Sequence, residues 1–502
     1  MNTQAYAPVI DRGGVPQPSR IPKTPWRLIP EIDKDPRFVA YAQRLPGRVA
    51  LFGVLAMLAA LLNFLGVDLF VAPLATACAY AQKLRRYLIP LATLLMLYRH
   101  GFWVDGGLVQ RVIEQEGLTS QISQPLLFSG TLALVLVVCS CLLIVWPRMV
   151  AIPLFRRSTL CLLSGFIALV VAAQSPIAAG IPRIVLWSFV MTFLPYLWFL
   201  AYALADVGSL VRMPFWQHLG VFHPFWGSTM TPFGKGLSYL AKFDAKTPEE
   251  LAVTQLKGLK LACWTLVLAV CLKGFTTLIH FYLALPLFDD TFLGYLAGAP
   301  YPRYLCWASL VAFFVADVLN MAVWGGAIIA CARMAGFRLL RNTYRPLEAT
   351  TLAEFWNRYY FYYKELLVDH FFYPVFLRYF RGNRKLRMFF ATFMAACVGN
   401  LLFHFIRDIH FVAEMGWWNA VSGEASHALY TLLLAIGVAL SQLRTHDRER
   451  SRGWLRGRVL PCLWVMLFFC VLHVFDAPLD RVHSIGQRAD FLTYLLGVDT
   501  WI

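Results

Sequence analysis

Long apolar runs alternate with short polar segments along most of the chain. A helix needs about 20 apolar residues to cross the core of a bilayer, and the runs scatter around that length. We therefore predict an all-α, polytopic membrane protein with about ten to twelve transmembrane or re-entrant helices, some of them tilted or broken. The apolar runs lie at 50–66, 68–82, 87–98, 126–146, 158–174, 183–205, 260–285, 303–334, 388–406, 424–443 and 459–476.

The composition supports a membrane protein and suggests a different explanation for the high net charge than nucleic-acid binding. Hydrophobic residues make up 59% of the 502 residues and charged residues only 15%, whereas soluble domains carry about 25% charged residues. A net charge of +17 would suit a nucleic-acid-binding protein, but here the basic residues cluster between the apolar runs. Cytosolic loops of membrane proteins carry such an excess of Lys and Arg. We therefore expect membrane lipids, and no nucleic acid, as partners.

The polar segments divide the chain into four parts. Residues 1–48 are polar and proline-rich, carry eight Lys or Arg residues and lack the apolar core of a signal peptide, which predicts a cytosolic tail. Residues 49–205 hold the first transmembrane helices, and 206–445 hold the candidate chemistry. Residues 446–502 hold a basic loop and the last transmembrane helix.

His404 lies inside the apolar run at 388–406, which otherwise contains no Lys, Arg, Asp, Glu or His. A titratable side chain at that depth is costly and indicates a functional site. Histidines in membranes also serve as hydrogen-bonding contacts between helices, and the run alone does not separate the two roles. Asn400 precedes His404 by four residues and therefore shares its helix face.

The segment before this run contains a motif with a family signature. Residues 354–360 read EFWNRYY and are followed by Leu367, Asp369 and Pro374. This pattern resembles the signature of the membrane-bound O-acyltransferase (MBOAT) family, whose bacterial members include alginate O-acetylases and teichoic-acid D-alanyltransferases. Residues 382–385 read GNRK, similar to a turn of that family, and His404 falls where the family has its buried histidine.

Earlier segments extend the resemblance to roughly residues 220–445. The stretches at 225–236 (FWGSTMTPFGKG) and 256–260 (LKGLK) are similar to a re-entrant loop and a helix entry of the bacterial members. Two positions depart from the pattern. Tyr360 replaces the histidine that ends the motif, and Phe405 replaces the usual glycine after the buried histidine, where we expect it to add bulk beside the reacting group.

The resemblance implies an MBOAT-like catalytic core at 206–445 in a multi-pass protein of the plasma (inner) membrane. It implies transfer of an acyl group, most simply acetyl, from acyl-CoA or a carrier-protein thioester to a hydroxyl of a glycan, lipid or small metabolite. The thioester is a co-substrate, and neither a bound cofactor nor a metal is implied. His404 would act as general base. The other assigned residues are Asn357 and Asn400 in catalysis, and Trp356, Arg358, Tyr360, Arg384 and Lys385 in substrate binding.

Each assignment has a structural alternative. Asn357 and Arg358 suit an interfacial helix anchor, and Asn400 suits a contact between helices. The basic residues near Arg384 suit anionic lipid head groups, and Asp369 suits an ion pair with Arg358 or Lys364. His427 starts the next apolar run, where it either packs between helices or faces the same cavity.

Two other functions remain open for the whole chain. A transporter or flippase also uses ionisable residues and broken helices near the middle of the membrane. A scaffold related to the family, with an inactive site, would explain the changes at Tyr360 and Phe405.

Overall fold

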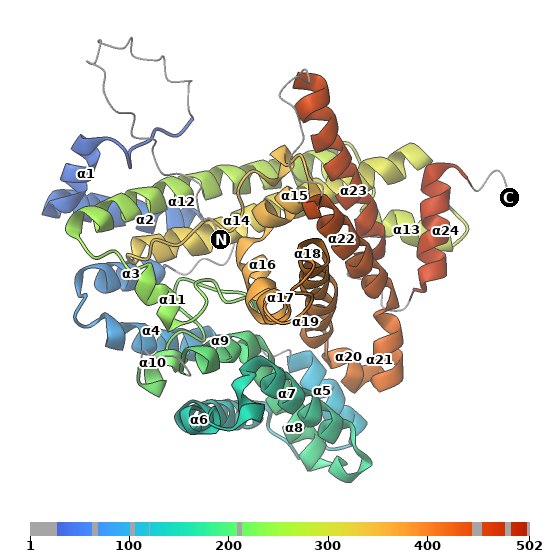
Figure 1. The fold of residues 1–502 in the computed structure, drawn as a ribbon, viewed down its shortest axis with the longest axis horizontal. Coiled ribbons are helices and arrows are strands. Elements are labelled where there is room, and N and C mark those ends of the chain that lie inside the picture. Colours follow the sequence, from blue (N-terminus) through green and yellow to red (C-terminus); the bar gives the residue numbers. More distant parts are fainter. Residues whose placement is uncertain are drawn as a thin grey trace.

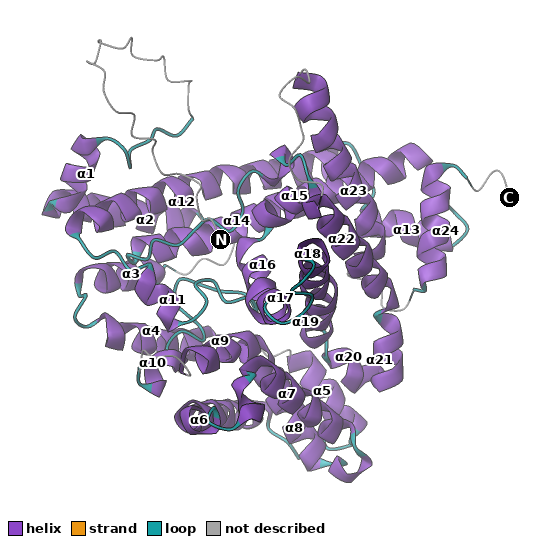
Figure 2. Ribbon diagram, viewed as in Figure 1, coloured by secondary structure: helices purple, strands orange, loops and turns teal. Residues whose placement is uncertain are grey.

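All the regular secondary structure in the part that the structure describes is helical, apart from one isolated bridge. The helices are joined by loops, no strand is present in that part (Figure 2), and an isolated antiparallel bridge joins Asp244 to Phe337. The all-α prediction is confirmed for these residues. The computed structural model describes residues 28–62, 69–100, 106–119, 121–207, 213–443, 454–476 and 483–498. Most of the predicted tail and the start of the basic loop at 446–458 lie outside these ranges.

Among the described residues, seven helices are long and apolar enough to cross a membrane, as expected of a multi-pass membrane protein. The candidate spans are α6 (Gln124–Met149), α8–α9 (Ile181–Val207), α12 with its π-helical end η5 (Pro248–Tyr282), α14 (Arg303–Met334), α18–η8–α19 (Arg384–Arg407), α22 (Ala425–Leu443) and η9–α23 (Leu455–Asp476).

The number of long spans is lower than the ten to twelve helices predicted because three apolar runs form shorter helices. These are α3 (Val71–Tyr80), α4 (Arg85–His100) and α7 (Ser158–Gln174), of 10, 16 and 17 residues. An eighth span is possible if α1 (Pro36–Gln43) and α2 (Leu45–Leu61) count as one, but they bend by 96°. The bend follows from the extended backbone of Arg44 before a proline in the first turn of α2.

Short helices complete the fold and connect the spans. They are α5 (Gly106–Gln115), α10 (Phe215–Leu219), α11 (Leu237–Lys242), α13 (Phe288–Leu296), α15 (Leu352–Tyr359), α16 (Phe361–Leu367), α17 (Tyr373–Phe376), α20 (His410–Met415), α21 (Trp417–Gly423) and α24 (Ile485–Leu496). Helix α18 covers Arg384–Phe393 and α19 covers Asn400–Arg407, while α8 covers Ile181–Phe193 and α9 covers Leu197–Val207.

Helices α12 and α14 lie side by side along one edge of the molecule, and α6–α9 lie on the opposite side (Figure 1). Small residues allow the two long helices to approach closely. A Cβ atom on Gly326 of α14 would lie 2.5 Å from the Oγ1 atom of Thr265 on α12. Helices α16–α19 lie between the two groups (Figure 1).

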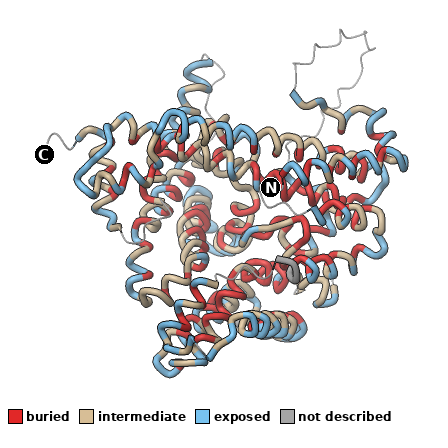
Figure 3. The backbone as a smooth tube through the Cα atoms, turned by 180° about the vertical axis from the view of Figure 1, so that it is seen from behind, coloured by how far each residue is buried: buried red, intermediate tan, exposed pale blue. Residues whose placement is uncertain are grey.

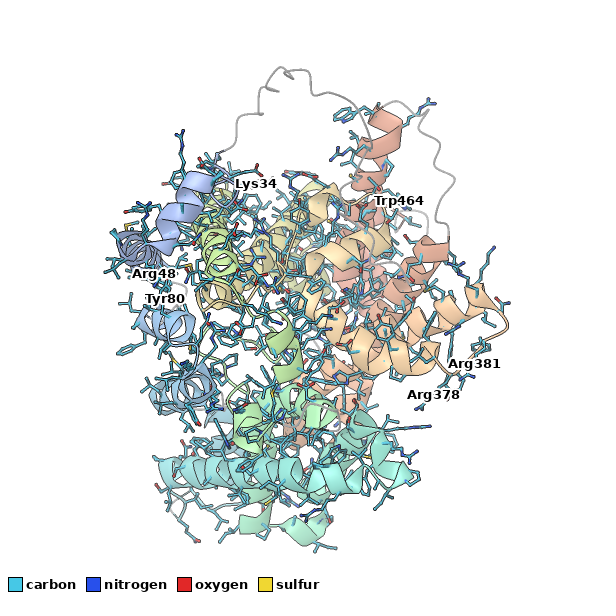
Figure 4. The ribbon with its side chains drawn as sticks, turned by 60° about the vertical axis from the view of Figure 1, so that its left-hand side comes forward. Lys34, Arg48, Tyr80, Arg378, Arg381 and Trp464 are labelled. Atoms are coloured by element: carbon cyan, nitrogen blue, oxygen red, sulfur yellow. The ribbon has the colours of Figure 1, made fainter. Side chains whose placement is uncertain are left out.

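The span α8–α9 forms part of the protein core. In this span 83% of the apolar window is buried, against 22% in α6. Trp187 and Trp198 on it are almost completely buried, and Figure 3 shows buried backbone concentrated in the interior. By contrast, the outward sides of the other spans expose apolar side chains, such as Trp464 of α23 (Figure 4). Such surface is typical of contact with lipid.

Two π-helical segments meet beside the helix that carries His404. They are η7 (Val368–Phe372) and η8 (Met394–Gly399), and they pack against each other. Gly399 permits the contact, because a Cβ atom there would lie 2.7 Å from the ring of Phe371. Single π turns inside α-helices occur frequently at functional sites.

Candidate active site

His404 lines a cavity of about 440 Å³ that is enclosed mainly by aromatic side chains. The cavity lies between α14, α15, α16, α19, α22 and α23, with one wall formed by the loop at 229–231. Its aromatic lining residues are Phe314, Phe355, Trp356, Tyr359, Tyr360, Tyr363, Phe403, Tyr430 and Phe469. Its other lining residues are Thr229, Met230, Thr231, Asp317, Met321, Asn400, His404, Arg407, His473 and Asp476.

Helix α19 directs its polar residues into this cavity. Asn400, His404 and Arg407 are separated by four and three residues and therefore lie on one face of the helix. Arg407 forms a two-point ion pair with Asp408, with N···O distances of 2.9 and 2.7 Å. This pairing leaves Asp408 engaged at the end of the helix.

Two groups from other helices adjoin His404. The ring of His427, in the first turn of α22, has its centroid 4.3 Å from that of His404. The Nδ1 atom of His427 lies 2.9 Å from the Oδ1 atom of Asp476, the last residue of α23. Tyr430 stacks on the ring of His427 at 5.3 Å. His427 therefore packs between helices, the first of its two alternatives, and it does not line the cavity.

Asn400 forms the contact between helices that was its structural alternative. It is 2% exposed, and its Oδ1 atom accepts a hydrogen bond of 2.5 Å from the Tyr363 hydroxyl of α16. Asn400 also lines the cavity.

Replacement of Tyr363 by phenylalanine should lower the thermal stability of the protein. The change leaves the buried carbonyl of Asn400 without its donor, which typically costs about 1–3 kcal/mol. The measurement is the apparent melting temperature of the purified variant in detergent. Tyr379→Phe is the control, because Tyr379 is 53% exposed. An equal melting temperature for Tyr363→Phe and wild type would show that the hydrogen bond adds no stability.

A second carboxylate lies in the wall of the cavity. Asp317 is the only charged residue of α14 between Arg303 and Arg333. Its Oδ2 atom accepts a hydrogen bond from the hydroxyl of Tyr359. The cavity is therefore bordered by two carboxylates, Asp317 and Asp476, and by one guanidinium group, Arg407.

Tyr360 lies beside the loop at 229–231. Its hydroxyl is 3.0 Å from the Oγ1 atom of Thr229. Burial raises the pKa of Tyr360, so its phenol stays protonated at neutral pH and forms hydrogen bonds without carrying a charge. The loop with similarity to a re-entrant segment thus borders the same cavity as the motif residue that replaces the family histidine.

The predicted site residues separate into two groups. Trp356, Tyr360, Asn400 and His404 line the cavity. The other four do not: Asn357, Arg358, Arg384 and Lys385. Helix geometry explains the difference between Trp356 and Asn357, because consecutive residues of α15 point about 100° apart.

The four outlying residues lie on or near the protein surface. Asn357 is exposed, and Arg358 forms an ion pair with Glu354 one turn earlier. Arg384 and Lys385 are exposed in the first turn of α18, which Asn383 caps by accepting a hydrogen bond of 3.0 Å from the Leu386 amide. The motif residues GNRK therefore begin a helix. Arg378 and Arg381, which precede them, lie at the edge of the molecule in Figure 4.

Asp369 does not pair with Arg358 or Lys364, and that expectation was wrong. Its Oδ2 atom lies 2.7 Å from Lys235 Nζ and accepts a hydrogen bond of 2.9 Å from Tyr202. The partner comes from the loop at 225–236, more than 130 residues earlier in the chain, and so could not be identified from neighbouring residues.

Phe405 does not narrow the cavity as its sequence position suggested. Its ring packs against Trp417 with a centroid distance of 5.9 Å, and Phe405 is not a lining residue. Consecutive helical residues point in directions about 100° apart, which directs Phe405 away from the side that His404 faces.

No family model matches the chain, and no curated protein matches it at a significant level. The geometry is that of a multi-pass helical membrane protein with an aromatic cavity that His404 and His473 both line. The ring of His427, paired with Asp476, lies beside His404.

Proposed function

We propose that the protein is a membrane-bound O-acyltransferase of the MBOAT type, which transfers an acyl group from a thioester to a hydroxyl. The observation that carries the proposal is the convergence of separate motif segments on one cavity. Trp356 and Tyr360 of the EFWNRYY segment, the loop at 229–231 and the buried His404 all line it. These segments are far apart in sequence, and the resemblance assigned Trp356, Tyr360 and His404 to one site.

The reaction needs a base and two substrates brought into contact. In the proposed step, His404 takes the proton of the acceptor hydroxyl while the oxygen attacks the thioester carbonyl. The carbon–sulfur bond breaks, the sulfur receives the proton, and an ester and a free thiol leave. A general base typically contributes about 10²–10⁴-fold to the rate, and holding both substrates in place contributes further.

Asn400 is the side chain best placed to assist at the carbonyl oxygen. Since its own oxygen accepts the hydrogen bond from Tyr363, its amide nitrogen is the atom that can donate to negative charge developing on the thioester. Donors fixed before the reaction stabilise such charge effectively in a site without bulk water.

The donor is proposed to be acetyl-CoA or another acyl-CoA, or the thioester of a carrier protein. The acceptor is proposed to be a hydroxyl of a glycan, lipid or small metabolite. Aromatic rings dominate the lining and suit both the faces of sugars and acyl chains. The exposed basic residues Arg378, Arg381, Arg384 and Lys385 lie outside the cavity and suit contact with phosphate groups of lipids or of the donor.

Turnover by the purified protein tests this function. We expect the protein in lipid nanodiscs to release free thiol from acetyl-CoA when a membrane and glycan extract is added. Acetyl groups carrying a heavy isotope should then appear as esters in that extract, as read by mass spectrometry. An absence of both thiol release and labelled esters with acetyl-CoA and longer acyl-CoA donors would contradict the proposal. Protein-dependent uptake of solutes by proteoliposomes in that case would favour a transporter.

A further inference from the structure

We infer that His427 and Asp476 are positioning residues that hold His404 in place and stabilise it when it carries the transferred proton. The inference rests on the proposed function. It assigns roles to two side chains that none of the motifs contains, one of which, His427, does not itself line the cavity.

The first part of the argument is the fixed orientation of His427. Asp476 accepts a hydrogen bond from its Nδ1 atom at 2.9 Å, and Tyr430 stacks nearly parallel to its ring, with 19° between the planes. A carboxylate bound to Nδ1 places the proton of the neutral ring on that nitrogen. The lone pair is then on Nε2. His427 is thereby held from two directions by groups on α22 and α23.

The second part of the argument is the missing hydrogen bond at the Nε2 atom of His427. This atom is buried and has no hydrogen-bond partner among the described residues. A buried acceptor without a donor typically costs about 1–3 kcal/mol. Groups of this kind in native structures call for an explanation, and a catalytic role is one of the recognised ones. The neighbouring ring, 4.3 Å away between centroids, is the imidazole proposed to receive a proton.

The third part is the change of charge during the reaction. As the proposed general base, His404 is neutral before the reaction. Its ring then interacts only weakly with the negative charge of Asp476. Once His404 has taken the hydroxyl proton, the ring is positive and lies beside the lone pair of His427 and the carboxylate behind it. The pair thus interacts more strongly with the transition state than with the bound substrates, which is the condition for acceleration. The proton passes on to the departing sulfur.

The positive charge of Arg407 does not cancel this stabilisation of protonated His404. Arg407 also lines the cavity, but its guanidinium is paired with Asp408 through both oxygens. Asp317, the other carboxylate in the wall, accepts a hydrogen bond from Tyr359 on a different helix. Asp476 is therefore the carboxylate that connects to His404 through an imidazole.

The test measures thioester turnover by full-length Asp476→Asn and His427→Gln at increasing acetyl-CoA concentrations. Both variants should lower kcat by about 10–100-fold and leave the KM for acetyl-CoA within about twofold, since the lost interaction exists mainly in the transition state. Asp476→Glu, which keeps the charge, should recover part of the rate. The matched control Asp490→Asn removes an exposed carboxylate on α24 and should leave both constants unchanged.

A purely structural role for the pair predicts a different result. It would lower the yield of folded protein or the melting temperature without a selective loss of kcat. His427→Gly provides an independent measurement, because added imidazole should restore turnover by occupying the space of the missing ring. If either Asn or Gln variant fails to fold, the other variant and the imidazole experiment still decide the matter.

The outcomes separate the inference from the proposed function. Wild-type turnover with an unchanged kcat in Asp476→Asn, or in His427→Gln, overturns the inference alone. Wild-type protein without any turnover overturns the proposed function and the inference together.

Discussion

Replacement of His404 by alanine is expected to lower thioester turnover by about 10²–10⁴-fold, the usual contribution of a general base. The loss should appear in kcat, because the imidazole acts on the hydroxyl proton and does not bind the donor. His404 faces the cavity, so its removal enlarges a space that already exists and should not collapse the surrounding helices. Initial rates of thiol release from acetyl-CoA measure the effect.

Two further variants make this result interpretable. His404→Gln keeps most of the side-chain volume and a hydrogen-bonding group but cannot accept the proton, so it should be as impaired as alanine. His483→Ala removes a histidine outside the cavity, where the ring packs against Phe292, and should keep the wild-type rate. Full activity in both His404 variants would show that another group, or none, serves as the base.

Replacement of Lys235 by methionine is expected to destabilise the protein by about 3–5 kcal/mol, the usual result of removing one partner from a buried ion pair. Lys235 Nζ lies 2.8 Å from Glu365 and 2.7 Å from Asp369, and its side chain is 12% exposed. Two carboxylates would be left in a confined space without their shared cation. The apparent melting temperature in detergent, at neutral pH, measures the loss.

The pH dependence of this loss follows from the two shifted groups. Burial alone would lower the pKa of Lys235, but the two carboxylates outweigh it and raise the pKa. Burial alone would raise the pKa of Glu365, but Lys364 and Lys235 outweigh it and hold the pKa below 4.5. The stabilisation from Glu365 is therefore present above pH 4.5 and lost as the pH falls through its lowered pKa, while that from Lys235 persists until the pH passes above its raised pKa.

The difference between wild type and Lys235→Met should accordingly be largest near neutral pH and shrink below pH 4.5. There Glu365 becomes protonated, so the wild type loses the ion pair between Lys235 and Glu365 that the variant already lacks. Lys242→Met is the control, because Lys242 is exposed on α11 and should change the stability by less than about 0.5 kcal/mol. A difference that stays constant with pH would contradict the assigned pairing.

The sequence predicts the helices well because each apolar run carries its own signal. The run at 303–334 coincides with α14, Arg303–Met334, and that at 424–443 nearly coincides with α22. Runs such as 68–82 form helices too short to span a membrane. Hydropathy does not show this, because a helix buried in protein and a helix in contact with lipid are both apolar. The span Ile181–Val207 shows this overlap, being apolar and 83% buried within the protein.

The candidate site was predictable only where a single segment shows it. His404 stands out because its run contains no other Lys, Arg, Asp, Glu or His residue, and Asp317 carries a similar signal in the middle of α14. Asp476 gives no such signal because it ends its helix, as charged residues commonly do. Its relation to His404 runs through His427, 49 residues earlier in the chain than Asp476, and exists only after α22 and α23 have packed.

The wide turn at Met394–Gly399 also affects how this chain should be compared with others. A π turn bonds residue i to i+5 rather than i+4, so it contains one residue more than the α-helical turn that it replaces. A homologue with a regular helix would reach the position of His404 one residue sooner after its helix cap at Asn383. Alignments should therefore permit a single-residue deletion in this interval, because a search with rigid spacing would overlook such a homologue.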